Sequence, residues 1–311
     1  MAGPNVLSAI IIVNLHKEDA GSVAEEIRRE LESVGVKTTI FAFEGRPSAP
    51  PKGGWDIAFS LGGDGTVLYT ARILAQSGTP ILPVHLGTLG FLAGVERHEW
   101  LWIYRRWLAG EIKPSRRCML EFSIERGGKY AVNNSVCLND VVISSLGIAK
   151  LIRLQARTEV APGEFAEIGC YRSDGLIIAT PTGSTAYSMA AGGPILDPEM
   201  EAQIISPICP FTLSNRPLVL PSRQALQITV CAEQRSGVLL TCDGQETFDL
   251  EPGDLVTIRH SPHYALLLTA GYSSYYKALA EKLAWYSEGG IVSYGDAASK
   301  GVGTSEGGVH A

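Results

Sequence analysis

Apolar residues in the first 115 positions alternate between short continuous runs and stretches with helical spacing. Continuous runs bounded by polar residues indicate strands that are buried on both faces. They predict strands at 8–15, 36–43, 56–61 and 80–86. Apolar residues every three or four positions predict helices at 22–34, 67–75 and 99–109, the first opened by a capping box of Ser22 and Glu25. This alternation predicts an α/β domain with a parallel, Rossmann-like sheet.

The pattern changes after about residue 115. Short apolar segments separated by Gly, Asn or Pro are typical of an antiparallel β-domain. We predict strands at 121–125, 130–132, 140–144, 151–158, 175–179, 225–230, 238–241, 255–258 and 264–268. Near the end, Tyr275, Leu279, Leu283 and Trp285 form a helical stripe, which predicts a helix that packs back on the first domain.

These patterns divide the chain into three parts. Residues 1–115 together with 269–288 form the predicted α/β domain, and residues 116–268 form the predicted β-rich domain. Residues 289–311 are rich in Gly, Ser and Ala with few apolar side chains, which predicts a disordered tail.

Charge and cysteine usage narrow the class of protein. The formal net charge is -6, so we expect no nucleic-acid partner, because such proteins usually carry a basic balance or stripe. None of the six cysteines has the C-x-x-C spacing of a zinc or thioredoxin-like site, so we expect buried free thiols. His260 and His263 flank a Ser-Pro turn and are expected at the surface. The N-terminus lacks a basic signal-peptide region and no apolar run approaches about 20 residues, which predicts a cytoplasmic protein without a membrane partner.

The segment from Leu61 to Thr66 joins a predicted buried strand to a predicted helix. Its sequence is Leu-Gly-Gly-Asp-Gly-Thr. A helix start presents unpaired N–H groups that favour phosphate, and the glycines let the backbone approach a ligand. We predict a phosphate-binding turn formed by Gly62, Gly63, Gly65 and Thr66. Asp64 either serves the chemistry, as a proton acceptor or metal ligand, or merely caps the helix.

Two further segments carry polar side chains at strand ends. Thr182, Ser184, Thr185 and Tyr187 cluster after the apolar strand 175–179 and suit ribose hydroxyls or phosphates, although a Ser/Thr-rich turn explains them equally well. Asn139 and Asp140 precede another strand, where an amide and a carboxylate can grip a ribose, but an ordinary turn has the same composition.

Together these segments resemble the NAD kinase family, whose members use ATP or polyphosphate. The resemblance covers residues 8 to 288. Its pieces, in the family's order, are 62–66, 86–92, 138–142, 174–187, 215–221 and 243–245. The run from Asp174 to Tyr187 is the most specific piece, whereas the first motif is shared with lipid kinases and phosphofructokinases.

The resemblance implies transfer of a phosphoryl group to the 2′-hydroxyl of the adenosine ribose of NAD, giving NADP. Asp64 matches the family's general base, and residues 116–268 become the NAD-binding domain. Asn139 and Asp140 match the ribose-gripping pair, although many members carry Glu at the second position, and Asp174 matches a carboxylate near the nicotinamide, sometimes contributed by another subunit. The remaining positions that match NAD contacts are Gly65, Phe91, Lys150, Arg172, Thr185, Ala186, Tyr187, Ser188, Met189, Ala190 and Gln245.

The resemblance also implies cofactors and partners. The family needs a divalent cation, usually Mg²⁺, held through the donor phosphates rather than in a dedicated protein site. Members form homodimers or homotetramers. Two other hypotheses stay open: a lipid or sugar kinase with the same turn, disfavoured by 139–140 and 180–187, and a non-catalytic NAD sensor, disfavoured by the presence of Asp64.

Overall fold

The computed structural model describes residues 5–45, 52–87, 89–147, 150–212, 214–269 and 272–284. Trp285 and the predicted tail at 289–311 lie outside the described residues. Within the described part of the chain, no helix is long and apolar enough to cross a membrane.

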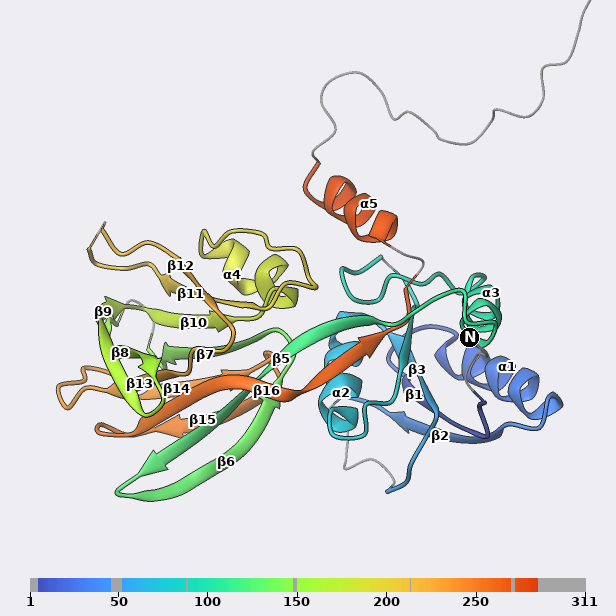
Figure 1. The fold of residues 1–311 in the computed structure, drawn as a ribbon, viewed down its shortest axis with the longest axis horizontal. Coiled ribbons are helices and arrows are strands. Elements are labelled where there is room, and N and C mark those ends of the chain that lie inside the picture. Colours follow the sequence, from blue (N-terminus) through green and yellow to red (C-terminus); the bar gives the residue numbers. More distant parts are fainter. Residues whose placement is uncertain are drawn as a thin grey trace, which may run out of the picture.

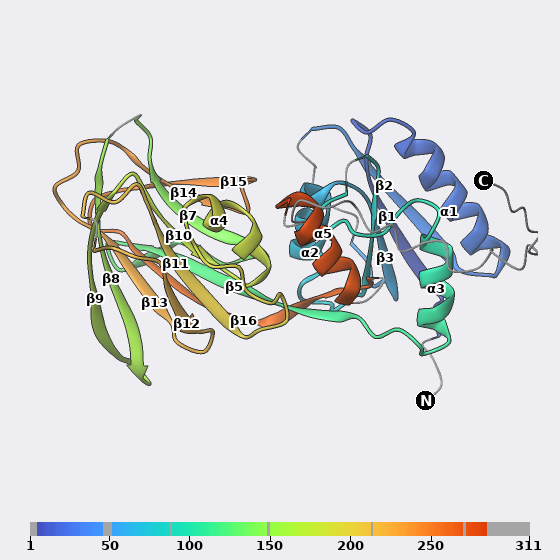
Figure 2. The ribbon, with the colours of Figure 1, turned by 90° about the horizontal axis from the view of Figure 1, so that it is seen from above.

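The N-terminal half is built on a parallel sheet in the order β2-β1-β3-β4. Its elements are β1 (Ser8–Asn14), α1 (Ala20–Ser33), β2 (Lys37–Phe43), β3 (Ile57–Gly62), α2 (Asp64–Leu74), β4 (Ile81–His85) and α3 (Trp100–Leu108). The buried residues of α1 and α3 pack against one face of the sheet, and those of α2 pack against the other (Figure 2). The predicted α/β class is confirmed.

The start of α1 differs from the prediction. The helix begins at Ala20 after Asp19, and the Ser22 hydroxyl donates back to the carbonyl oxygen of Asp19 at 2.8 Å. Glu25 binds Arg28 one turn along the helix instead of reaching back to the helix start. The capping box is therefore wrong, because both side chains already lie inside the first turns of the helix.

The C-terminal half consists of antiparallel strands in two packed layers around a shared apolar core. Its strands are β5 (Ser115–Arg126), β6 (Lys129–Cys137), β7 (Asp140–Ser145), β8 (Ile152–Ala161), β9 (Glu164–Ser173), β10 (Gly175–Ala179), β11 (Ala202–Ile208), β12 (Leu218–Pro221), β13 (Leu226–Val230), β14 (Val238–Cys242), β15 (Glu246–Leu250) and β16 (Leu255–Leu267). One layer has the order β12-β11-β10-β7-β14-β15, which confirms the β-rich domain. Strands β9, β11, β12 and β15 were not predicted, and the two predicted strands at 255–258 and 264–268 are a single strand with an irregularity between His260 and Tyr264.

Strands β5 and β16 pair with each other and carry the chain between the two halves (Figure 1). The far end of β16 joins the N-terminal sheet, where Leu267 pairs with Ile81 of β4. The domain boundaries that we place near residues 115 and 269 stay a prediction.

Helix α5 (Tyr272–Lys282) contacts both halves of the molecule. The hydroxyl groups of Tyr275 and Tyr276 donate to the Leu196 carbonyl oxygen and the Asp197 carboxylate, each at 3.2 Å. The Lys282 ammonium lies 5.0 Å from the ring centroid of Phe91 in the N-terminal half. The helix thus contacts the N-terminal half at Phe91 and also binds the loop that follows the short helix α4 (Tyr187–Ala190), and its assignment to the first domain stays a prediction.

The polar and sulfur side chains follow the sequence predictions only in part. All six cysteines are free, but Cys170 and Cys209 are exposed rather than buried. His260 is half-buried against the ring of Tyr264, and this burial lowers its pKa, so the prediction of a surface residue is wrong for it.

Candidate functional site

The turn Gly62–Thr66 lies where β3 ends and α2 begins, at the carboxyl edge of the parallel sheet. Ligands of open α/β sheets bind at this edge, and the first N–H groups of α2 are directed out of the helix end. A Cβ atom at Gly62 would lie 2.2 Å from the Thr66 hydroxyl oxygen, so the turn accepts only glycine there without rearrangement. The local geometry is that of an anion-binding helix start.

The Asp64 carboxylate is held by the backbone of a loop that follows β4. Its Oδ2 accepts a hydrogen bond from the Phe91 N–H at 3.0 Å, and its Oδ1 accepts from Leu92 at 3.1 Å and Ala93 at 2.9 Å. The residue preceding the helix is Gly63, and Asp64 makes no capping bond to its own helix. Asp64 is therefore not a simple helix cap; its side chain is fixed in one orientation, with three of about four acceptor sites in use.

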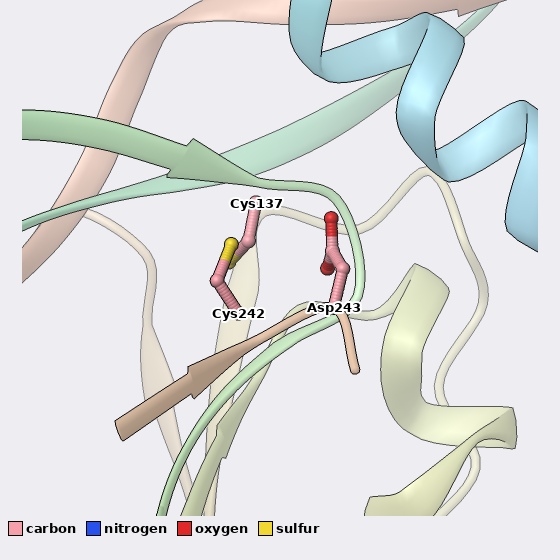
Figure 3. A group of neighbouring side chains, drawn as sticks. All are labelled: Cys137, Cys242 and Asp243. Carbon is pink, nitrogen blue, oxygen red and sulfur yellow. The ribbon is translucent and has the colours of Figure 1, made fainter. Parts of the chain in front are cut away.

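The C-terminal half forms the other wall of the site, with Asn139 and Asp140 at the start of β7. The carboxylate of Asp243, directly after β14, lies inside the curve of this turn (Figure 3). Its Oδ1 accepts from the N–H groups of Asn139 at 2.7 Å and Asp140 at 3.2 Å, and its Oδ2 accepts from Leu138 at 3.0 Å. One buried side chain thus sets the shape of the backbone that presents Asn139 and Asp140.

Burial dominates the electrostatics of this wall. Burial raises the pKa of Asp243, against the backbone N–H donors and Arg72, which lower it. Burial, together with the charge of Asp243, raises the pKa of Asp140 to about 7. Two carboxyl groups in one buried site resist simultaneous ionisation.

This arrangement predicts that Asp140→Asn stabilises the fold at alkaline pH. The unfolded chain loses the Asp140 proton near its ordinary pKa, whereas the folded chain keeps it to about pH 7, so stability falls as pH rises through this window. The corresponding upper limit is about 4 kcal/mol at roughly 1.4 kcal/mol per pH unit, and we expect about 2 kcal/mol because buried sites relax. Urea unfolding of both proteins at pH 5 and pH 8 measures the difference.

The matched control is Asp249→Asn, which changes an exposed carboxylate on β15. We expect it to leave the difference between pH 5 and pH 8 unchanged. Equal pH dependence of Asp140→Asn and the unaltered chain would contradict the assignment of a buried, protonatable Asp140.

The hydroxyl-rich loop after β10 is fastened to the Asn139 turn. The N–H of Thr180 donates to the Asn139 carbonyl oxygen at 2.9 Å, and its hydroxyl donates to the Leu138 carbonyl oxygen at 2.6 Å. A Cβ atom at Gly183 would lie 2.1 Å from that same Asn139 oxygen, so only glycine permits the close approach. Asn139 Oδ1 and Thr182 Oγ1 are buried and have no hydrogen-bond partner among the described residues, which leaves both available to a ligand.

The loop residues differ in their exposure. Thr185 and Ser188 are buried, and the Ser188 hydroxyl lies 3.0 Å from that of Ser206. Tyr187 and Ala190 are exposed, and Ala186 and Met189 are half-buried. Two hydroxyls of the predicted NAD-contacting loop, those of Thr185 and Ser188, therefore already bind protein groups.

Three predicted site residues lie just before β8, on β9 and at the far end of β10. Asp174 precedes β10, whereas Thr180 follows it, so the two are six residues apart along an extended strand, a distance of about 20 Å. Arg172 is exposed with its guanidinium group 4.7 Å from the centroid of the Phe211 ring, and Lys150 is exposed before β8. The structure does not bring Lys150, Arg172 and Asp174 to the Asp64 site within one chain.

Gln245 connects the two walls. Its Nε2 donates to the Gly65 carbonyl oxygen at 2.7 Å, and its Oε1 accepts from Arg72 Nη2 at 3.0 Å. Both functions of this amide are engaged between α2 and the β14–β15 turn. Arg72 was not identified from the sequence, although it lies two helical turns after Asp64.

A cleft of about 820 Å³ opens beside the turn. The described residues that line it include Asn14, Lys17, Gly63, Gly65, Thr66, Tyr69, Arg72, Gln245 and Glu246. Lys17 and Arg72 supply positive charge to a cleft whose floor is the start of α2. A second cleft, of about 760 Å³, lies along the loop that holds Asp64 and includes Phe91.

One group of metal-ligand side chains lies close together within the described residues: Cys137, Cys242 and Asp243 (Figure 3). Both thiols are buried in the apolar core, and Asp243 is already hydrogen-bonded by three N–H groups. Soft thiols are poor ligands for Mg²⁺, which prefers oxygen. Hard oxygen donors occur instead in the cleft at Asn14, Thr66 and Glu246, and they fit a cation that takes its other ligands from phosphates and water.

Models of known protein families match segments in both halves of the chain. The model of the ATP-NAD kinase N-terminal domain matches residues 48–112, and that of the ATP-NAD kinase C-terminal domain matches residues 138–270. An NAD kinase of Treponema denticola is 39% identical over 277 residues, covering 89% of this chain and 95% of that protein. An NAD kinase of Geobacter sulfurreducens is 37% identical, covering 88% and 97%.

Solved structures share the fold. A yeast NADH kinase complexed with NADH superposes with a TM-score of 0.77 at 24% identity, over 93% of this chain and 91% of that one. An NAD kinase from Archaeoglobus fulgidus in complex with ATP gives a TM-score of 0.70 at 24% identity, over 88% and 97%. With relatives this similar over nearly its whole described length, the chain belongs to the NAD kinase family.

Proposed function

We propose that this chain transfers the terminal phosphoryl group of ATP to the 2′-hydroxyl of the adenosine ribose of NAD, giving NADP and ADP. The observation that carries the proposal is the Asp64 carboxylate, fixed by three backbone N–H groups at the start of α2. Family membership supports the same reaction. The two walls give it separate places for acceptor and donor.

Asp64 acts as the general base. The ribose oxygen attacks the terminal phosphorus, the new O–P bond forms, and the bond to the bridging oxygen breaks with its electron pair leaving on ADP. The hydroxyl proton passes to the carboxylate of Asp64. Because backbone donors hold this carboxylate, it does not have to be oriented anew in each cycle.

The acceptor binds along the wall formed by 139–140 and the loop 180–190. Asn139 Oδ1 and Thr182 Oγ1, which have no hydrogen-bond partner among the described residues, supply polar contacts. Asp140 binds the ribose. Phe91, whose N–H already binds Asp64, packs against the adenine. Of the remaining proposed NAD contacts, residues 185–190 belong to this wall, and Gly65 and Gln245 lie where it meets the donor cleft. Lys150, Arg172 and Asp174 contact the nicotinamide end from a neighbouring copy in a homodimer or homotetramer.

The donor binds in the 820 Å³ cleft at the start of α2. The N–H groups of the turn and the side chains of Lys17 and Thr66 contact its phosphates. Asn14, Thr66 and Glu246 are the oxygen donors beside which a Mg²⁺ ion would be held, largely by the phosphates themselves. When bound, the ion neutralises charge on the transferred group. We place the reaction in the cytoplasm.

A coupled assay tests this function. Purified protein with ATP, Mg²⁺ and NAD is expected to form NADP, detected by a dehydrogenase specific for NADP. Polyphosphate in place of ATP, and NADH in place of NAD, define the donor and the acceptor. No product above the enzyme-free blank with any donor would overturn the proposal, and phosphorylation of a lipid or sugar in its place would favour the alternative kinases.

A further inference from the structure

We propose that Arg72, Gln245 and Asp243 form a positioning network that holds the acceptor wall in register with the Asp64 turn. The inference rests on the proposed function and deepens it. The three residues come from both halves of the molecule, so the network spans the site. None of them needs to touch the reacting atoms to act.

Arg72 lies on α2 with its side chain only 8% exposed. Its Nη2 donates to Gln245 Oε1 at 3.0 Å and to Glu246 Oε1 at 3.2 Å. Its Nη1 donates to the Cys242 carbonyl oxygen at 3.4 Å and lies 3.9 Å from Asp243 Oδ2. One guanidinium group therefore binds the whole β14–β15 turn of the opposite half.

Asp243 links Arg72 to the acceptor wall. Its side chain is completely buried, and its two oxygens accept the three N–H groups of Leu138, Asn139 and Asp140. Arg72 is the cation paired with this carboxylate. A buried carboxylate that loses its cation is strongly destabilised. Loss of Arg72 would therefore loosen the turn that presents Asn139 and Asp140.

Gln245 links the network to the Asp64 turn. Its Nε2 binds the carbonyl oxygen of Gly65, the residue directly after Asp64. The same amide accepts from Arg72, so the Asp64 turn, α2 and the β14–β15 turn are joined by consecutive hydrogen bonds. A displacement of about 1 Å between reacting groups is enough to cost roughly 100-fold in rate. The network acts by preventing such a displacement.

The test compares Arg72→Gln with Arg126→Gln. Arg126 pairs with Asp254, whose side chain is 1% exposed, at 2.7 Å within the β-domain and away from both clefts, so the control removes a similar pair. We expect Arg72→Gln to lower kcat for NAD phosphorylation by about 30- to 100-fold. We expect it to raise the Kd for NAD, measured without donor, by about tenfold, because the acceptor turn loosens. Arg126→Gln is expected to lower Tm and leave both quantities within about twofold of the unaltered enzyme.

Two further variants keep the test decisive. Gln245→Ala removes the bond to Gly65 but leaves Arg72 beside Asp243, so kcat falls while the Kd for NAD rises less than it does in Arg72→Gln. Arg72→Lys keeps the charge but not the forked geometry, so Tm recovers more than kcat does. If Arg72→Gln does not fold, these two variants carry the test.

Each contrary outcome is distinct. An increase confined to the KM for ATP would make Arg72 a ligand of the donor and overturn the positioning role. A lower Tm of Arg72→Gln with unchanged kcat and unchanged Kd for NAD would overturn it as well. If the unaltered chain makes no NADP, the proposed function fails, whereas an unchanged Kd for NAD in Arg72→Gln overturns the network alone.

Discussion

Replacing Asp64 by Asn is expected to lower the turnover of NAD phosphorylation by at least about 100-fold, the usual contribution of a general base. The amide has nearly the shape of the carboxylate but cannot accept the ribose proton. It also has a single oxygen, so it cannot accept all three N–H groups of Phe91, Leu92 and Ala93. Steady-state kinetics with saturating ATP, together with NAD binding by calorimetry, measure the two effects.

Measuring kcat and KM separately distinguishes a general base from an anchor. A base predicts that kcat falls while NAD still binds. An anchor for the Phe91 loop predicts that KM for NAD rises while kcat persists. Unchanged turnover in Asp64→Asn would remove Asp64 from the base role.

Replacing Gly90 by Ala is expected to lower turnover by about 10- to 100-fold, within the range of losses caused by small misplacements of reacting groups. A Cβ atom at this position would lie 1.8 Å from Asp64 Oδ1 and 2.6 Å from its Cγ. The short side chain of Asp64 must move, and it then leaves the N–H groups that orient it. The fold itself should survive, because the clash is with a side chain and not with backbone.

Gly94→Ala in the same loop is the matched control. A Cβ atom at Gly94 would meet nothing within 4 Å, so we expect activity within about twofold of the unaltered enzyme and an unchanged Tm. Thermal unfolding of both variants shows whether any loss of activity reflects unfolding. Full activity in Gly90→Ala would mean that the orientation of Asp64 seen here is not the one used in catalysis.

The parts of the site that are local in sequence could be predicted. The Gly-Gly-Asp-Gly turn follows from a buried strand meeting a helix, and the α/β and β-rich halves follow from the spacing of apolar residues. The pair Asn139–Asp140 could be named because an amide and a carboxylate stand together at a strand start. Each of these signals spans only a few positions.

The parts of the site that depend on residues distant in the sequence could not be predicted. Arg72 and Gln245 are 173 residues apart, and nothing in either segment indicates that they meet. The separation of Asp174 from Asp140 depends on which way β10 runs beside β7. Strand β11 contains Pro207, which argues against a central strand, and much of β12 is exposed, so neither has the apolar pattern of a buried strand.

The paired strands β5 and β16 set the distance between the two halves of the site. They pair from Ser115 opposite Leu267 to Glu125 opposite Leu255, and the irregularity between His260 and Tyr264 places thirteen residues of β16 opposite eleven of β5. Deleting one residue from β5 alone would turn its later side chains to the opposite face and take Phe122 and Ile124 out of the core. A one-residue change in β5 therefore needs a compensating change in β16. The length of the β5–β16 pair thus sets the distance between the regions proposed for the donor and the acceptor. Loops outside this pair can vary in length without changing that distance.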